Sequence, residues 1–174
     1  MIVPFLSSAC LAFASAIILS TPDLGKSDAQ CRDNENGPAF LIDVVGLKDR
    51  TGRLKLEVYP ANEADFLADD NILISQGKTF RRVETPVSQG SPIQLCVRLP
   101  GPGRYAVMVL HDRDSNRKFG VSIDGVGFGG NPKLGLGKPK AVAASIVAGT
   151  GPIRQRIVMN YRRGLLSFGP LAAR

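Results

Sequence analysis

The run from Tyr105 to Leu110 constrains the fold most strongly, because it is a strand-like segment with two apolar faces. Its side chains alternate between the faces: Tyr105, Val107 and Val109 on one, and Ala106, Met108 and Leu110 on the other. A strand of this kind belongs in the interior of a sheet that is covered on both sides. The chain must therefore form a sheet with an apolar layer on each face.

Other segments predict shorter strands around this central one. Residues 53–59 show the clearest alternation, with Leu54, Leu56 and Val58 on one face and charged residues between them. Further strands are expected at residues 40–47, 77–87, 92–99, 141–148 and 152–162. The 19 glycines and 12 prolines, without any long helical periodicity, favour short strands joined by turns. We therefore expect an all-β sandwich of about seven strands, forming a single domain over residues 30–163.

Three segments leave alternatives open. Residues 61–70 predict a short helix or a loop, with Asn62 as the N-cap, and residues 72–74 predict a short strand or an anchored loop. Residues 112–140 contain seven glycines and predict one long loop, which is uncommon in a compact domain and often functional. The tail at residues 164–174 either packs back on the domain or forms a disordered end.

The first 29 residues are typical of a secretory signal peptide. Phe5–Leu19 is uncharged and apolar or small, and it is shorter than the roughly 20 apolar residues of a comfortable transmembrane helix. Ser27-Asp28-Ala29 predicts cleavage before Gln30. No Lys or Arg precedes the apolar run, so an uncleaved membrane anchor is the alternative. We expect a periplasmic or secreted protein that contacts the membrane only through this segment before cleavage.

Export determines how the three cysteines are interpreted. Cys10 leaves with the signal, and Cys31 and Cys96 remain as a pair in an oxidising compartment. Cys96 falls on the polar face of its strand, where a segment outside the core can reach it. We predict a Cys31–Cys96 disulfide, whose loop of about 65 residues contributes roughly 4 kcal/mol on the chain-entropy model. Two free thiols are the alternative.

The net charge of +7 is spread over the chain and predicts a solvated basic surface. Aromatic residues make up 6% of the chain, which is too few for the stacking platforms of single-strand nucleic-acid binding. We expect no nucleic-acid partner. The expected partner is an envelope component, either a protein or a polysaccharide.

Two segments carry a resemblance to a known family. PGPGRYAVMVLHDRDSN at residues 100–116, followed by GVGFGGNP at residues 125–132, resembles the bacterial domain of unknown function 2141 family. The resemblance spans roughly residues 38–162 and implies an exported immunoglobulin- or transthyretin-like sandwich with no assigned activity. The chain departs from the family pattern after the strand, where Arg117 and Gly120 replace a glycine and an aspartate.

The residues after the central strand suggest a cation site. Asp112, Asp114 and Asn116 have the oxygen spacing of the first half of an EF-hand-like calcium loop. Arg117 stands where such a loop needs glycine, however, and neighbouring basic residues oppose a divalent cation. The alternative is that these side chains cap the turn through Asx-type hydrogen bonds.

The other candidates in this region are His111, Asp124 and Phe128. His111, the chain's single histidine, either hydrogen-bonds a loop carbonyl, Asp112 or Asp124, or forms a His/Asp site for proton transfer or metal. The glycines around Phe128 imitate a nucleotide-binding motif, but Asn131-Pro132 prevents the helix that such a motif needs. With no activated nucleophile and no expected cofactor, we predict a binding or structural module that uses the 112–140 loop. A calcium-dependent envelope protein using His111, Asp112, Asp114 and Asn116 is the alternative.

Overall fold

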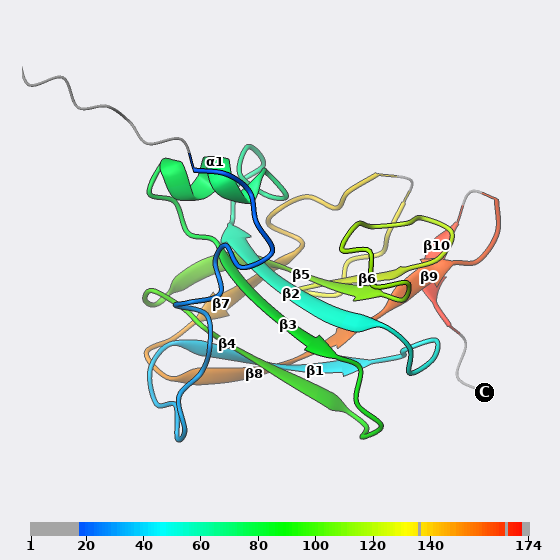
Figure 1. Ribbon diagram of the computed structural model, residues 1–174, viewed down its shortest axis with the longest axis horizontal. Helices are drawn as coiled ribbons and strands as arrows, with labels where there is room; N and C mark the ends of the chain where they lie inside the picture. Colours follow the sequence, from blue (N-terminus) through cyan, green and yellow to red (C-terminus); the bar gives the residue numbers. More distant parts are fainter. Residues whose placement is uncertain (1–17, 136, 166, 172–174) are drawn as a thin grey trace, which may run out of the picture.

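A computed structural model describes residues 18–171 except 136 and 166, so most of the predicted signal segment lies outside the described residues. Two sheets pack face to face, as the sequence predicts for an all-β sandwich (Figure 1). The described strands are β1 (Ala39–Val45), β2 (Arg53–Pro60), β3 (Arg81–Pro86), β4 (Ile93–Arg98), β5 (Gly103–Asp112), β6 (Gly125–Phe128), β7 (Ser145–Ala148), β8 (Pro152–Val158), β9 (Asn160–Arg162) and β10 (Phe168–Pro170), and the described helix is α1 (Asp70–Ser75).

The two sheets differ in size and pairing. The smaller sheet has the order β4-β1-β8, and β1 pairs with β8 in parallel. The larger sheet has the order β10-β9-β6-β5-β2-β3, with β7 also paired to β5. The chain passes from the small sheet to the large one between β8 and β9, where the Met159 N–H donates to the Val45 carbonyl at 2.9 Å. As the sequence predicts, β5 lies inside its sheet, between β2 and β6.

The two faces of the larger sheet carry separate apolar clusters. The inner core lies between the sheets and includes Phe40, Ile42, Leu56, Val107, Val109 and Ile157. The outer cluster lies on the opposite face of the larger sheet and includes Tyr59, Phe66, Leu73, Phe80, Val126 and Phe128. Because β5 contributes to both, its alternation of two apolar faces is explained.

The structure corrects the prediction of one long loop over residues 112–140. Residues 125–128 form β6, which is fully buried and pairs with β5. Gly125 and Gly127 face the inner core, where a Cβ atom would overlap the Tyr161 ring or lie 2.6 Å from Ile157 Cγ2. Val126 and Phe128 face the outer cluster. These glycines are therefore packing positions in a strand.

Other elements also depart from the expected boundaries. The helix begins at Asp70, while Asn62 caps the preceding turn by accepting the Asp65 N–H at 3.0 Å. Residues 141–144 form a turn, and the strand predicted there begins at Ser145. The tail packs back on the domain, because β10 pairs with β9. Both ends of the described chain thus contact the sandwich.

The N-terminal segment, residues 18–29, runs from α1 past β3 to β4 (Figure 1). The Arg82 N–H donates to the Gly25 carbonyl at 2.9 Å, and the Arg98 N–H donates to the Ala29 carbonyl at 2.8 Å. Lys26 Nζ lies 3.1 Å from a Glu84 carboxylate oxygen, and Ala29 is fully buried. Cleavage before Gln30 stays a prediction, and it would remove all of these contacts.

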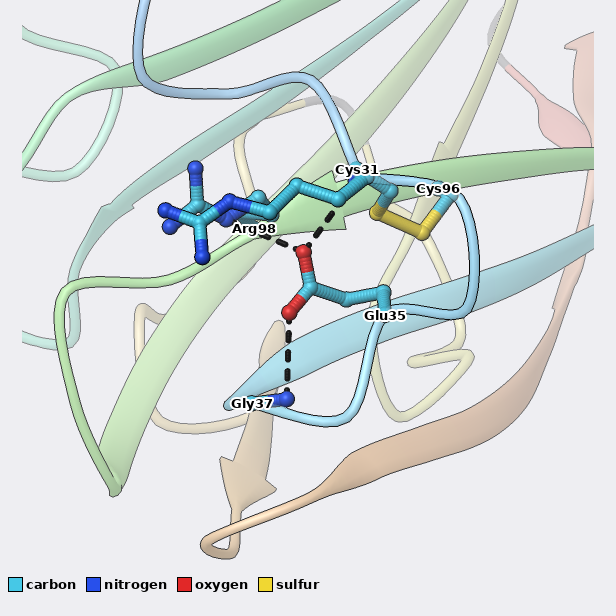
Figure 2. Close-up of a disulfide and its surroundings, with 6 residues drawn as sticks. Cys31, Glu35, Gly37, Cys96 and Arg98 are labelled. Atoms are coloured by element: carbon cyan, nitrogen blue, oxygen red, sulfur yellow. Dashed lines mark hydrogen bonds and ion pairs between the residues drawn. A yellow bond between two sulfur atoms is a disulfide. The ribbon is translucent and has the colours of Figure 1, made fainter.

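A disulfide joins the segment after this one to the smaller sheet, and it is the predicted Cys31–Cys96 pair. Its Cα atoms are 5.9 Å apart. Figure 2 shows Glu35 beside it, accepting the Gly37 N–H at 3.0 Å and pairing with Arg98 Nε at 3.0 Å. The disulfide and this carboxylate together fix residues 31–37 against β4.

None of the helices in the described part of the chain is long and apolar enough to cross a membrane.

Candidate functional site

The predicted site begins with the last residues of β5, which lie inside the larger sheet. His111 lies between Leu54 of β2 and Gly125 of β6, and Asp112 lies opposite Arg53 of β2. The exposed fractions of His111 and Asp112 are 0% and 1%. The chain then leaves the sheet, makes a turn and returns as β6, so this turn connects two neighbouring buried strands.

This connection, residues 112–124, is here called the acidic turn, and a buried carboxylate closes each end of it. Asp112 accepts the N–H groups of Asn116 at 3.1 Å and Arg117 at 2.8 Å. Asp124, 1% exposed, accepts the N–H groups of Arg113 at 2.9 Å and Gly120 at 2.7 Å. Side chains that bond to nearby backbone groups in this way hold a turn in one conformation. The Asx-type capping that the sequence offers as an alternative is therefore present.

The acidic turn also brings three carboxylates together. One oxygen each from Asp112, Asp114 and Asp124 lies within 4.8 Å of the other two. The Asn116 side chain donates to Asp114 at 2.8 Å and accepts the Lys118 N–H at 2.7 Å. Burial raises the pKa of Asp112, and the nearby acids raise it further, against the lowering effect of the backbone N–H groups.

The two arginines of the turn pair with acids outside it. Arg113 Nε lies 2.8 Å from an oxygen of Asp49, and Arg117 Nε lies 3.6 Å from an oxygen of Glu84. Burial raises the pKa of Asp49, but hydrogen bonds from Arg113 and Thr51 outweigh it and lower this pKa to about 2. Calcium binding at Asp112, Asp114 and Asn116 stays a prediction, and calorimetry with calcium would test it.

His111 is held by two hydrogen bonds in the inner core. Its Nε2 lies 2.9 Å from the Thr51 carbonyl, which only accepts, so Nε2 carries the proton. Nδ1 then accepts from the Tyr161 hydroxyl at 2.6 Å, and that hydroxyl accepts the Lys48 N–H at 3.1 Å. Burial lowers the pKa of His111 and raises that of Tyr161 to about 12. The neutral ring is fully bonded.

Of the alternative partners predicted for His111, the loop carbonyl is the one present. The bond from Tyr161 to the other ring nitrogen was not predicted. A carboxylate oxygen of Asp49 lies 3.8 Å from Nε2, but the neutral ring forms no ion pair with it. Tyr161 comes from β9, 50 residues along the chain, so no local pattern indicated it.

An open cavity of about 470 Å³ lies on the outer face of the larger sheet. Its floor consists of Met108 from β5 and Val126 and Phe128 from β6. Its walls come from the acidic turn, from the segment before β7 and from the β9–β10 tail, represented by Phe119, Val121, Leu134, Pro139, Leu165 and Phe168. The Phe119 and Phe168 rings meet edge to face with centroids 6.0 Å apart, which joins two of the walls.

Of the individually predicted candidates, Phe128 lines this cavity. Several other lining residues lie within the 112–140 segment that was predicted as the contact surface but were not singled out, and those from the tail were missed. A signal was present in the sequence for two of them: Phe119 and Val121 are large apolar residues in an otherwise polar or glycine-rich segment, whereas Leu165 lies in an apolar tail. Their exposed fractions are 47%, 53% and 82%. The acidic turn thus has a polar interior and presents apolar side chains to the cavity.

The fold and the cavity define an all-β sandwich with an open apolar cavity on one sheet face. The chain belongs to a bacterial family described as "Uncharacterized protein conserved in bacteria (DUF2141)", whose model matches residues 42–155. This confirms the resemblance seen in the sequence. No curated protein and no solved structure matches the chain. The matched range includes the acidic turn and the cavity floor, while Arg162, Leu165 and Phe168 lie beyond it.

Proposed function

We propose that this chain is an exported binding protein of the bacterial cell envelope that takes an apolar ligand into the cavity. The observation that carries this proposal is the cavity itself. Its volume of about 470 Å³ falls within the roughly 300–1,000 Å³ of small-molecule sites. Exposed apolar patches on a folded domain mark binding surfaces, and Phe119, Val121 and Leu165 form one at this cavity.

The buried ionisable groups at the end of β5 and in the acidic turn support binding rather than a reaction. His111 has no exposed surface, and both of its ring nitrogens are hydrogen-bonded. Asp112 and Asp124 each accept two backbone N–H groups. These bonds support a structural role for the histidine and the two buried acids. The cavity, by contrast, offers solvent-facing surface for a ligand.

Two features support export. The apolar segment at residues 5–19 has the composition of a signal peptide. The Cys31–Cys96 disulfide is of a kind that persists in oxidising compartments. Expression of the full chain in a bacterial host, followed by fractionation and mass spectrometry, tests this part. Periplasmic recovery of an oxidised, shortened chain is expected, and an uncut chain in the cytoplasm would contradict it.

Titration of the purified protein with Nile red, a neutral apolar dye, tests the cavity. Phe119→Ser is expected to weaken dye binding roughly tenfold, because it removes a large part of the apolar wall. Ile72→Ser is the matched control, since Ile72 is 46% exposed against 47% for Phe119 and does not line the cavity. Absence of dye binding, or equal losses in the two variants, would refute the cavity as the binding site.

A further inference from the structure

The charge at the cavity distinguishes between classes of apolar ligand. Ten of its fifteen lining residues are apolar, and the others are two glycines, Ser167, Lys138 and Arg162. None of these fifteen described residues is acidic. An apolar cavity with two cations and no anion in its lining favours a ligand that is apolar over most of its length and negatively charged at one end.

Arg162 is held in place by the loop that follows β9. Its Nε donates to the Gly164 carbonyl at 2.9 Å, and its Nη2 lies 3.4 Å from the Leu165 carbonyl. A guanidinium has five N–H donors, so these two bonds leave donors for a ligand. Both carbonyls belong to the short connection to β10. This connection supplies Leu165 to the wall, and β10 supplies Phe168. The cation and the apolar wall are therefore fixed relative to each other.

Lys138 is positioned by the turn before α1. Its Nζ donates to the Phe66 carbonyl at 3.0 Å and lies 5.7 Å from the centre of the Phe66 ring. A second carbonyl, that of Glu63, lies 3.4 Å away. Neither Lys138 nor Arg162 takes part in an ion pair within the described part of the chain, whereas Arg82, Arg113 and Arg154 all do. Among the described residues, the positive charge at the cavity is therefore not neutralised by an ion pair.

We infer that the ligand is a single-chain amphiphile with an anionic head group, its chain against Met108, Val126 and Phe128 and its head group at Arg162 and Lys138. This inference rests on the proposed function and specifies its ligand. A carboxylate and a phosphate share the required chemistry, since both accept charge-assisted hydrogen bonds from guanidinium and ammonium groups. The head group and the chain then account for the two kinds of surface in the cavity.

Displacement of Nile red by four dodecyl compounds, each below its micellar concentration or, for dodecanol, below its solubility limit, tests the inference. Dodecanoate and dodecyl phosphate carry anionic heads, dodecanol is neutral, and dodecyltrimethylammonium is cationic. We expect the anions to displace the dye at concentrations about tenfold lower than dodecanol, the gain expected of one charge-assisted hydrogen bond. The cationic compound is expected to be the weakest. The ratio between dodecanoate and dodecyl phosphate distinguishes a fatty-acid head from a phosphate head.

Variants at the cations separate charge from apolar contact. Arg162→Gln is expected to remove about tenfold of the affinity for the anions and to leave that for dodecanol unchanged. Arg163→Gln, at the neighbouring exposed position that does not line the cavity, is expected to change neither. Equal affinities for dodecanol and dodecanoate, or equal losses for both in Arg162→Gln, would overturn the anionic head group while leaving the proposed function intact. If the dye itself does not bind, both the proposed function and the inference fail.

Discussion

The acidic turn and the cavity are neighbours, and the chain that leaves β5 contributes to both. They differ in the chemistry and the exposure of their side chains. In the acidic turn, Asp112 and Asp124 are buried and each satisfies two backbone N–H groups. At the cavity, Phe119, Val121 and Leu165 are large apolar side chains left in contact with water. A polar cluster with complete bonding stabilises the fold. An apolar surface without a covering layer is a candidate for ligand binding. The buried polar residues that stand out in the sequence have hydrogen-bond partners within the protein, and the candidate binding surface lies beside them.

The largest effect on stability is expected at Gly125, a buried glycine that packs against Tyr161. Gly125→Ala would place a methyl group against the Tyr161 ring, which bonds to His111. We expect a loss of about 3 kcal/mol in the free energy of unfolding, measured by urea denaturation, because overpacking of a buried strand forces its neighbours to move. Gly135→Ala is the matched control at the cavity, where no atom lies within 4 Å of the new Cβ. Similar losses of stability in the two variants would contradict the distinction between the packed surroundings of Gly125 and the open cavity at Gly135.

A smaller effect is expected within the acidic turn. Asp124→Asn keeps the size of the side chain but replaces one acceptor oxygen with an NH₂ group, so either the Arg113 or the Gly120 N–H loses its partner. Leaving one buried donor unsatisfied is expected to cost about 2 kcal/mol. Asp114→Asn is the control, because Asp114 is exposed and its bonds are local. Urea denaturation of both variants measures the difference, and equal stabilities would show that the turn does not depend on its buried carboxylate.

The pH dependence of stability tests whether His111 is buried and neutral in the folded chain. Burial lowers its pKa below the ordinary value of 6.5, so below pH 6.5 the unfolded chain binds more protons at this residue than the folded chain. Its contribution to stability is complete above pH 6.5 and is lost as pH falls toward the lowered folded pKa. Urea denaturation of the native chain should show that its free energy of unfolding decreases as the pH falls below 6.5. His111→Gln should show a flatter dependence. Equal slopes would place the titrating group elsewhere.

How far the sequence predicts each region depends on whether its contacts are local. The strand β2 was predicted because apolar residues occupy alternate positions along it. The disulfide was predicted because two cysteines remain when the predicted signal segment is left out. The strand β6 was missed because Gly125 and Gly127 make room for Tyr161 and Ile157, which lie about 30 or more residues further along the chain. Local alternation does not reveal such a partner.

The candidate site, like the fold, was predicted only where its contacts are local. The spacing of Asp112, Asp114 and Asn116 indicated a polar turn. The second buried acid of this turn, Asp124, directly precedes β6 and lies outside that spacing. The cavity is lined by segments from Leu67 to Phe168, and no single motif contains them. Its residues become recognisable only when the fold shows which apolar side chains remain exposed.

The smallest effect on stability, and the sharpest contrast with the acidic turn, is expected at Leu165. This side chain is 82% exposed, so Leu165→Ser should change the free energy of unfolding by less than about 0.5 kcal/mol. It should nevertheless weaken Nile red binding, because Leu165 lines the cavity. Val142→Ser is the control, since Val142 is 59% exposed and does not line it. An open surface predicts a variant that binds less dye without a loss of stability. A loss of stability at Leu165 would mean that this side chain is part of the packed structure and that the cavity wall is not a separate open surface.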